Sequence, residues 1–122
     1  MEGLHAGELA RSRPVVLVSS DRLGTGDRRL GRILMKSFLN TVWDTENRPE
    51  RIIFLNSAVR LTTEGSDVLD ALALLERDGV ELLSCGTCLE YYGIKDRLKA
   101  GRVTNMREIA DTLFTASRVI RV

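Results

Sequence analysis

Short runs of apolar, largely β-branched residues alternate along this chain with segments in which apolar residues recur every three to four positions. The runs at 15–18 and 51–56 each precede such a segment, at 30–43 and 66–78 respectively. An unbroken apolar run is typical of a strand buried on both faces of a parallel sheet, and the longer spacing is typical of an amphipathic helix. The first half of the chain therefore predicts two strand-helix units.

The second half continues the pattern. A third apolar run lies at 80–84, helical spacing interrupted by a glycine covers 89–98, and short strands are expected at 102–104 and 117–122 around a helix at 106–114. This alternation predicts a three-layer α/β/α domain around a mostly parallel sheet of about five strands. The apolar positions expected to face the core are Leu30, Ile33, Leu34, Phe38 and Leu39 in the first helix, and Ile109, Leu113 and Phe114 in the last.

The length and the charge of the chain limit the number of domains and the classes of partner that it can have. Its 122 residues allow one domain, placed at 14–122, with 1–13 as a disordered tail or linker that carries the only histidine, His5. The 18 basic residues nearly balance the 17 acidic ones, so no charge excess marks a partner such as nucleic acid or a membrane. No apolar run approaches the ~20 residues that span a bilayer, and no secretory signal is present. We therefore expect a cytoplasmic protein with free thiols.

Ligands of open α/β sheets bind beyond the carboxyl ends of the strands. This rule selects the polar, small or reactive residues that follow each predicted strand. They are Ser20, Gly24 and Gly26 after the first strand, Asn56 after the second, Cys85, Gly86 and Cys88 after the third, and Asn105 after the fourth, where it also caps the next helix.

The most reactive of these residues is expected to be Cys85. It follows a buried strand directly and precedes a helix that is expected to begin near Cys88 or Leu89, and a helix N-terminus favours a thiolate over a thiol. Gly86 is expected to leave room for another sulfur atom or a partner chain. Cys88, about one helical turn away, is placed to resolve an oxidised or persulfidated Cys85 by forming a disulfide.

Other interpretations of these residues stay open. Both cysteines can be small buried hydrophobic residues without reactivity. A metal site is not expected, because structural zinc needs four ligands and the chain offers two cysteines and His5. The segment GTGDRRLG after the first strand matches the dinucleotide fingerprint poorly, so a tight turn and close packing are favoured over nucleotide binding, and no cofactor is expected.

Charged and aromatic residues surround this edge as well. Arg22, Arg28 and Arg60 are placed to meet an anionic substrate, although loop arginines are usually only solvated. One of Tyr91 and Tyr92 is expected to pack inward while the other lines a pocket or the core.

The segment CGTCLEYYG after GVELLS, together with the preceding FLN and the later TNM, resembles the DsrE/DsrF-like sulfurtransferase family. The resemblance covers about residues 14–122. It is strongest to the C-terminal domain of the selenium-metabolism (YedF-type) sulfurtransferase-like proteins.

The resemblance implies a flavodoxin-like fold, assembly into trimers or hexamers, and a cysteine after the third strand that carries sulfane sulfur as a persulfide. By position this cysteine is Cys85. Proteins of this type often carry a preceding domain similar to the sulfur carrier TusA, for which residues 1–13 are too short. The donor is therefore expected to be a TusA-like carrier or a cysteine desulfurase on a separate or longer chain.

Three functional hypotheses follow. The first is a sulfur relay in which Cys85 holds sulfane sulfur, or selenium, between donor and acceptor proteins, with Asn56 and Asn105 as hydrogen-bond donors. The second is a redox or regulatory binding module in which Cys85 and Cys88 switch between dithiol and disulfide. The third is an oligomeric scaffold whose cysteines are inert.

Overall fold

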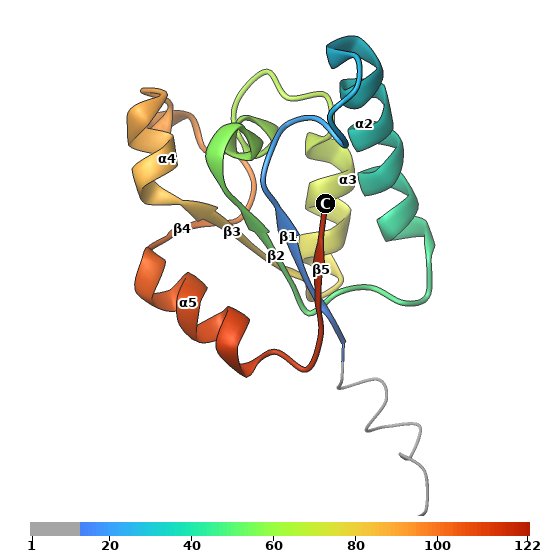
Figure 1. Ribbon diagram of the computed structural model, residues 1–122, viewed down its shortest axis with the longest axis vertical. Helices are drawn as coiled ribbons and strands as arrows, with labels where there is room; N and C mark the ends of the chain where they lie inside the picture. Colours follow the sequence, from blue (N-terminus) through green and yellow to red (C-terminus); the bar gives the residue numbers. More distant parts are fainter. Residues whose placement is uncertain (1–12) are drawn as a thin grey trace, which may run out of the picture.

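Five parallel strands form one sheet, in the order β4-β3-β2-β1-β5, in the computed structural model, which describes residues 13–122 (Figure 1). The sheet is wholly parallel, which agrees with the expected fold class. The strands are β1 (Val15–Val18), β2 (Arg51–Phe54), β3 (Glu81–Cys85), β4 (Arg102–Thr104) and β5 (Val119–Arg121). The helices between them are α2 (Arg28–Asp44), η1 (Asn56–Thr62), α3 (Leu69–Arg77), α4 (Gly86–Tyr91), η2 (Lys95–Arg97) and α5 (Met106–Thr115).

The helices are divided unequally between the two faces of the sheet. Strands β2, β3 and β4 are each added to the same edge of the growing sheet, so right-handed crossovers put α2, α3 and α4 on one face. The connection from β4 to β5 runs back across the sheet and puts α5 on the other face. Alternate strand residues follow this division: Val16, Ile52 and Leu82 pack towards the first face. Ile53 and Leu83 pack towards α5. The three-layer α/β/α prediction is confirmed.

Helix α2 begins two residues before its predicted start. The Asp27 side chain accepts a hydrogen bond from the Leu30 backbone N–H at 3.0 Å and so caps the helix. Its fully buried side chains are Met35 and Leu39. The expectation that Leu30, Ile33 and Leu34 face the core is wrong: they are 51%, 56% and 41% exposed, because the helix presents a narrower face to the sheet than its apolar pattern suggests.

Helix α4 differs most from its prediction. It begins at Gly86, directly after β3, and ends at Tyr91, where Gly93 follows with a left-handed φ of +67°. The expected helix over 89–98 is therefore wrong, because this glycine turns the chain before the separate turn η2. Between β2 and α3 the chain forms the seven-residue 3₁₀ helix η1, in a segment for which the apolar pattern predicts no helix.

The last helix keeps its predicted start. Asn105 accepts a hydrogen bond from the Glu108 backbone N–H at 2.9 Å, as its position before the helix predicts. Ile109 is buried and Leu113 half-buried, but Phe114 is 88% exposed, so its expected place in the core is wrong. Val119 and Ile120 are also largely exposed, because β5 is an edge strand.

The tail predicted at the N-terminus, with His5, lies outside the described residues except for Arg13. Among residues 13–122, no helix is long and apolar enough to span a bilayer.

Candidate functional site

The two cysteines lie at the junction of β3 and α4. Cys85 is the last residue of β3 and the N-cap of α4, and its side chain packs on the α5 face of the sheet in the same cluster as Ile109. It is only 3% exposed. Cys88 lies in the first turn of α4 and is half-buried, so it is the thiol more open to solvent.

A backbone group from the neighbouring strand exit contacts Cys88. The N–H of Asn56 donates a hydrogen bond to Sγ of Cys88 at 3.1 Å. Asn56 has a φ of +53°, a left-handed conformation that asparagine tolerates better than most residues. The sharp turn after β2 thus directs a main-chain donor at the sulfur, whereas Asn56 itself is exposed.

The local environment acts on the Cys88 thiol in opposing ways. Burial raises the pKa of Cys88 above its ordinary value, and hydrogen bonding and charge from Cys85 add to this rise. The Asn56 N–H opposes the rise, because it stabilises the thiolate. The Cys85 side chain therefore lies close enough to Cys88 to oppose ionisation of the Cys88 thiol.

Three further hydrogen bonds hold η1 in place. At its end, the hydroxyls of Thr62 and Ser84 lie 2.8 Å apart and are fully buried. At its start, Ser57 Oγ donates to the carboxylate of Asp21 and accepts from the Asp21 backbone N–H. These hydrogen bonds connect the segments that follow β1 and β2 to each other, and η1 to strand β3. Thr62 and Ser84 are not among the residues that the sequence pattern selects; the one available signal was a serine inside an apolar run.

At Gly86 the backbone packs closely against strand β4. A Cβ at this position would lie 3.1 Å from Val103 Cγ1 and 3.2 Å from the Thr104 carbonyl oxygen. The space that a side chain at position 86 would occupy is therefore filled by β4. The expectation that Gly86 leaves room there for another sulfur atom or a partner chain is wrong.

The other predicted site residues lie apart from the cysteine pair or have structural partners. Ser20 Oγ accepts the Arg22 backbone N–H at 3.0 Å within the loop after β1. Gly24 and Gly26 lie in the exposed part of that loop, with open space where a Cβ would be. The side-chain oxygen of Asn105 is engaged in capping α5. The structure thus brings together Cys85, Gly86, Cys88 and Asn56.

Tyr92 is half-buried and so packs partly inward, as expected for one of the two tyrosines, but the expectation that the other lines a pocket or the core is wrong, because Tyr91 is 83% exposed. Their rings form an edge-to-face pair with centroids 5.2 Å apart. The guanidinium of Arg60, on η1, lies 4.5 Å from the centroid of the Tyr92 ring. An arginine with a fixed orientation therefore lies near the cysteine helix.

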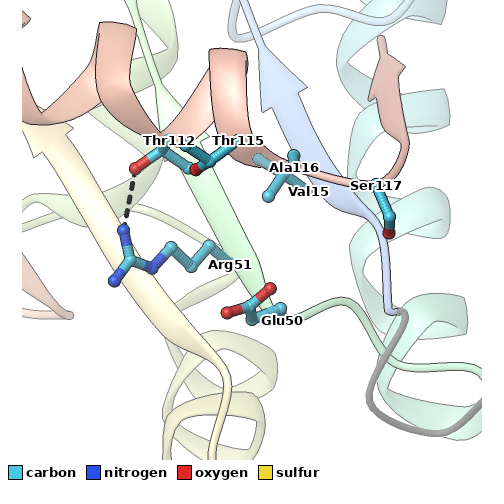
Figure 2. A pocket seen from close by; sticks show the side chains of 7 residues that line it. All are labelled: Val15, Glu50, Arg51, Thr112, Thr115, Ala116 and Ser117. Atoms are coloured by element: carbon cyan, nitrogen blue, oxygen red, sulfur yellow. Dashed lines mark hydrogen bonds between the residues drawn. The ribbon is translucent and has the colours of Figure 1, made fainter. Parts of the chain in front are cut away.

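A separate pocket of about 300 Å³ lies at the opposite end of the strands, beside the first residues of β1 and β2 (Figure 2). Arg51 points across it and donates a hydrogen bond to Thr112 at 2.8 Å. Its Nε is buried and has no hydrogen-bond partner among the described residues. None of the sequence-predicted site residues lines this pocket. Within residues 13–122, no three His, Cys, Asp or Glu side chains are grouped to hold a metal ion.

Comparisons with known proteins give matches in structure only. No protein-family model and no curated protein sequence matches the chain. The ychN protein from E. coli superposes with a TM-score of 0.68 at 17% identity, over 90% of this chain and 99% of that one.

Two proteins of unknown function also match. MTH1491 from Methanobacterium thermoautotrophicum has a TM-score of 0.60 at 20% identity, over 90% of this chain and 98% of its own. BT1422 from Bacteroides thetaiotaomicron has a TM-score of 0.62 at 12% identity, over 93% and 98%. At these identities the likeness establishes a shared fold over nearly the whole length of each chain.

Proposed function

We propose that the protein is a sulfur relay in which the Cys85 and Cys88 pair takes sulfane sulfur from a donor and passes it to an acceptor. The observation that carries the proposal is the backbone hydrogen bond from Asn56 to Cys88, which joins two sheet exits at a half-buried thiol. A main-chain donor 3.1 Å from the sulfur is suited to stabilise an anionic thiolate or persulfide.

The exposures of the two thiols favour a division of roles that differs from the sequence-based expectation. Cys85, at 3% exposure, has little surface for a donor to reach, whereas Cys88 is partly open. We therefore assign entry of sulfur to Cys88. Cys85 becomes the resolving thiol, close enough to affect the pKa of its neighbour.

The transfer requires no oxidant. The Cys88 thiolate attacks the outer sulfur of a donor persulfide, R–S–SH; a new S–S bond forms on Cys88, the donor S–S bond breaks, and the donor leaves as the thiolate R–S⁻. An acceptor thiolate removes the outer sulfur by the same step in reverse. If no acceptor arrives, the Cys85 thiolate attacks Sγ of Cys88, forms the disulfide and expels HS⁻.

Intact-mass analysis tests this function. The reduced protein is exposed to cysteine and a cysteine desulfurase, and the wild type is compared with Cys85→Ser and Cys88→Ser. We expect Cys85→Ser, which lacks the resolving thiol, to gain one sulfur atom that a thiol reductant removes. The wild type should gain the same atom before Cys85 converts the persulfide to the disulfide, and Cys88→Ser should not gain it. Loss of the gain in Cys85→Ser alone would return the carrier role to Cys85, as the sequence suggests.

A redox module is the second candidate function, and the proximity of the two thiols favours it. In that case no variant gains sulfur, and the wild type instead loses two hydrogen atoms under mild oxidation.

Membership of the DsrE/DsrF-like family, self-association and a cytoplasmic location belong to the same proposal. The shared fold with ychN is compatible with that family. The exposed apolar residues of α2 and β5 support self-association, because burial of exposed apolar side chains favours an interface. Selenium in place of sulfur would follow the same displacement chemistry, and the mass gain distinguishes the two elements.

A further inference from the structure

A pocket of about 300 Å³ on the α2 side of the sheet contains more positive than negative side chains. It lies between the first half of α2, η1 and the start of α3, at the same end of the strands as the cysteines. The charged residues that line it are Asp21, Arg32, Lys36, Arg60 and Asp67.

The carboxylates in this pocket already have partners. Asp67 pairs with Lys36 at 3.8 Å. Asp21 is bonded by Ser57 and lies 3.7 Å from Arg22. Neither Arg32 nor Arg60 has a carboxylate within 4.0 Å among residues 13–122. Two arginines that line this pocket are therefore not neutralised by a carboxylate, and guanidinium groups bind carboxylates in a bidentate manner.

Arg60 links this pocket to the thiols. Its guanidinium stacks on Tyr92, and the Tyr92 backbone N–H donates to the Cys88 carbonyl oxygen at 3.1 Å. Tyr92 is thus one helical turn from Cys88, a spacing that places Cβ atoms roughly 5–6 Å apart. The same helix, η1, begins at Asn56, which donates to Cys88 Sγ, and continues to Arg60.

We propose that this pocket binds the carboxylates of a small thiol compound that delivers sulfane sulfur to Cys88 or accepts it there. The inference rests on the proposed sulfur relay and names its small-molecule substrate class. With a carboxylate on Arg60 and Arg32, the sulfur end of such a compound is directed towards Cys88. In delivery, the Cys88 thiolate bonds to the outer sulfur of R–S–SH, and R–S⁻ leaves; acceptance is the reverse.

The size and charge of the pocket favour this class of ligand. A volume near 300 Å³ is at the lower end of small-molecule sites. Three cations facing two carboxylates give a small positive excess, which suits one or two carboxylates better than a polyphosphate. An acidic segment of a partner protein is the competing occupant, and the experiment separates it from the small thiol.

The test compares glutathione persulfide with the persulfide of glutathione diethyl ester, in which both carboxylates are masked. Mass spectrometry follows the rate at which the reduced protein is consumed, either by gain of one sulfur atom or, once Cys85 resolves the persulfide, by loss of two hydrogen atoms. We expect the wild type to react about tenfold faster with the acid, the factor that one charge-assisted contact supplies. Arg60→Ala and Arg32→Ala should lose this preference. Arg29→Ala should retain it, because this exposed α2 arginine has the same charge but does not line the pocket. Equal rates for acid and ester in the wild type would overturn the inference.

A binding measurement separates failure of the inference from failure of the relay. Titration of reduced protein with glutathione, followed by the NMR signals of the arginine side chains, should give a shift at Arg60 that the diethyl ester does not give. Binding without sulfur gain supports the pocket and rejects the relay. Sulfur gain from the desulfurase without glutathione binding supports the relay and rejects the small thiol. If the desulfurase rate then falls in Arg60→Ala, the arginine serves an acidic protein partner instead.

Discussion

The backbone N–H of Asn56 lies 3.1 Å from Sγ of Cys88, although 32 residues separate the two in the sequence. The contact exists because β2 and β3 are paired in parallel register, with Phe54 opposite Ser84, so that their exits lie side by side. Through this contact a main-chain turn opposes the effect of burial on the pKa of the Cys88 thiol, and the conformation of the turn becomes a testable feature of the site.

Substitutions at Asn56 should separate backbone from side chain. Asn56→Gly keeps both the N–H and the positive φ, so we expect unfolding free energy within about 0.5 kcal/mol of the wild type and an unchanged rate of Cys88 alkylation. Asn56→Ala keeps the N–H but should lose about 1 kcal/mol, because a β-carbon is unfavourable at a φ of +53°. Urea unfolding measures both. An equal loss in the two variants would mean that the side-chain amide itself stabilises the fold.

Removal of Cys85 should make Cys88 more acidic. Burial raises the pKa of Cys88, and the hydrogen bond and charge of Cys85 raise it further. Cys85→Ala removes only the Cys85 contribution, so the pKa should fall part of the way towards its ordinary value. The pH dependence of iodoacetamide labelling at Cys88 measures this, and its midpoint should move to lower pH. A midpoint that stays in place or rises would show that the two sulfurs do not interact.

The apolar pattern was sufficient to predict the strands and the fold class. The runs at 15–18 and 102–104 have the bounds of β1 and β4, because these segments are short and end at polar residues. The exposed side of α2 could not be predicted in this way. Leu30, Ile33 and Leu34 have the spacing of a core face, but only the packing of α2 on the sheet determines which of its apolar residues become buried.

The candidate site was predicted by its residues and not by its geometry. The rule that ligands bind beyond the strand ends selects Cys85, Cys88 and Asn56. A main-chain hydrogen bond has no sequence signature, so the contact between Asn56 and Cys88 depends on the strand order, which single-sequence patterns do not determine. The start of α4 was missed because Gly86 to Cys88 contain no apolar repeat.

Removal of the Thr62 hydroxyl and removal of the Ser84 hydroxyl, the buried pair that holds η1, should lower the free energy of unfolding by different amounts. Thr62 Oγ1 donates to the Val59 carbonyl oxygen, so the Ser84 hydroxyl must donate to Thr62. Thr62→Val leaves a buried O–H without that acceptor and should cost about 1–3 kcal/mol, whereas Ser84→Ala removes the donor and should cost about 1 kcal/mol.

Urea unfolding of both variants gives the comparison, with Thr41→Val as the control, because Thr41 is exposed and its hydroxyl has no hydrogen-bond partner among residues 13–122. A larger loss in Ser84→Ala than in Thr62→Val would contradict this donor assignment.

Acid should weaken the fold through Glu108. Hydrogen bonds from Arg102 and Thr104 lower the pKa of Glu108 from 4.5 to about 2. A lowered carboxyl pKa stabilises the folded state above the unfolded value, and this stabilisation is lost as the pH falls from about 4.5 through about 2. The side chain is 30% exposed, so we expect the contribution to be less than about 1 kcal/mol.

Urea unfolding between pH 7 and pH 2 measures this contribution as the difference between the wild type and Glu108→Gln. Glu108→Gln should be less stable than the wild type at pH 7, and the difference should shrink as acid protonates Glu108 of the wild type. Glu64→Gln is the matched control, because Glu64 is exposed and has no ion pair among residues 13–122. It should follow the wild-type profile, since no partner there favours the charged form. A constant difference between Glu108→Gln and the wild type over the whole pH range would assign the effect to packing instead of charge.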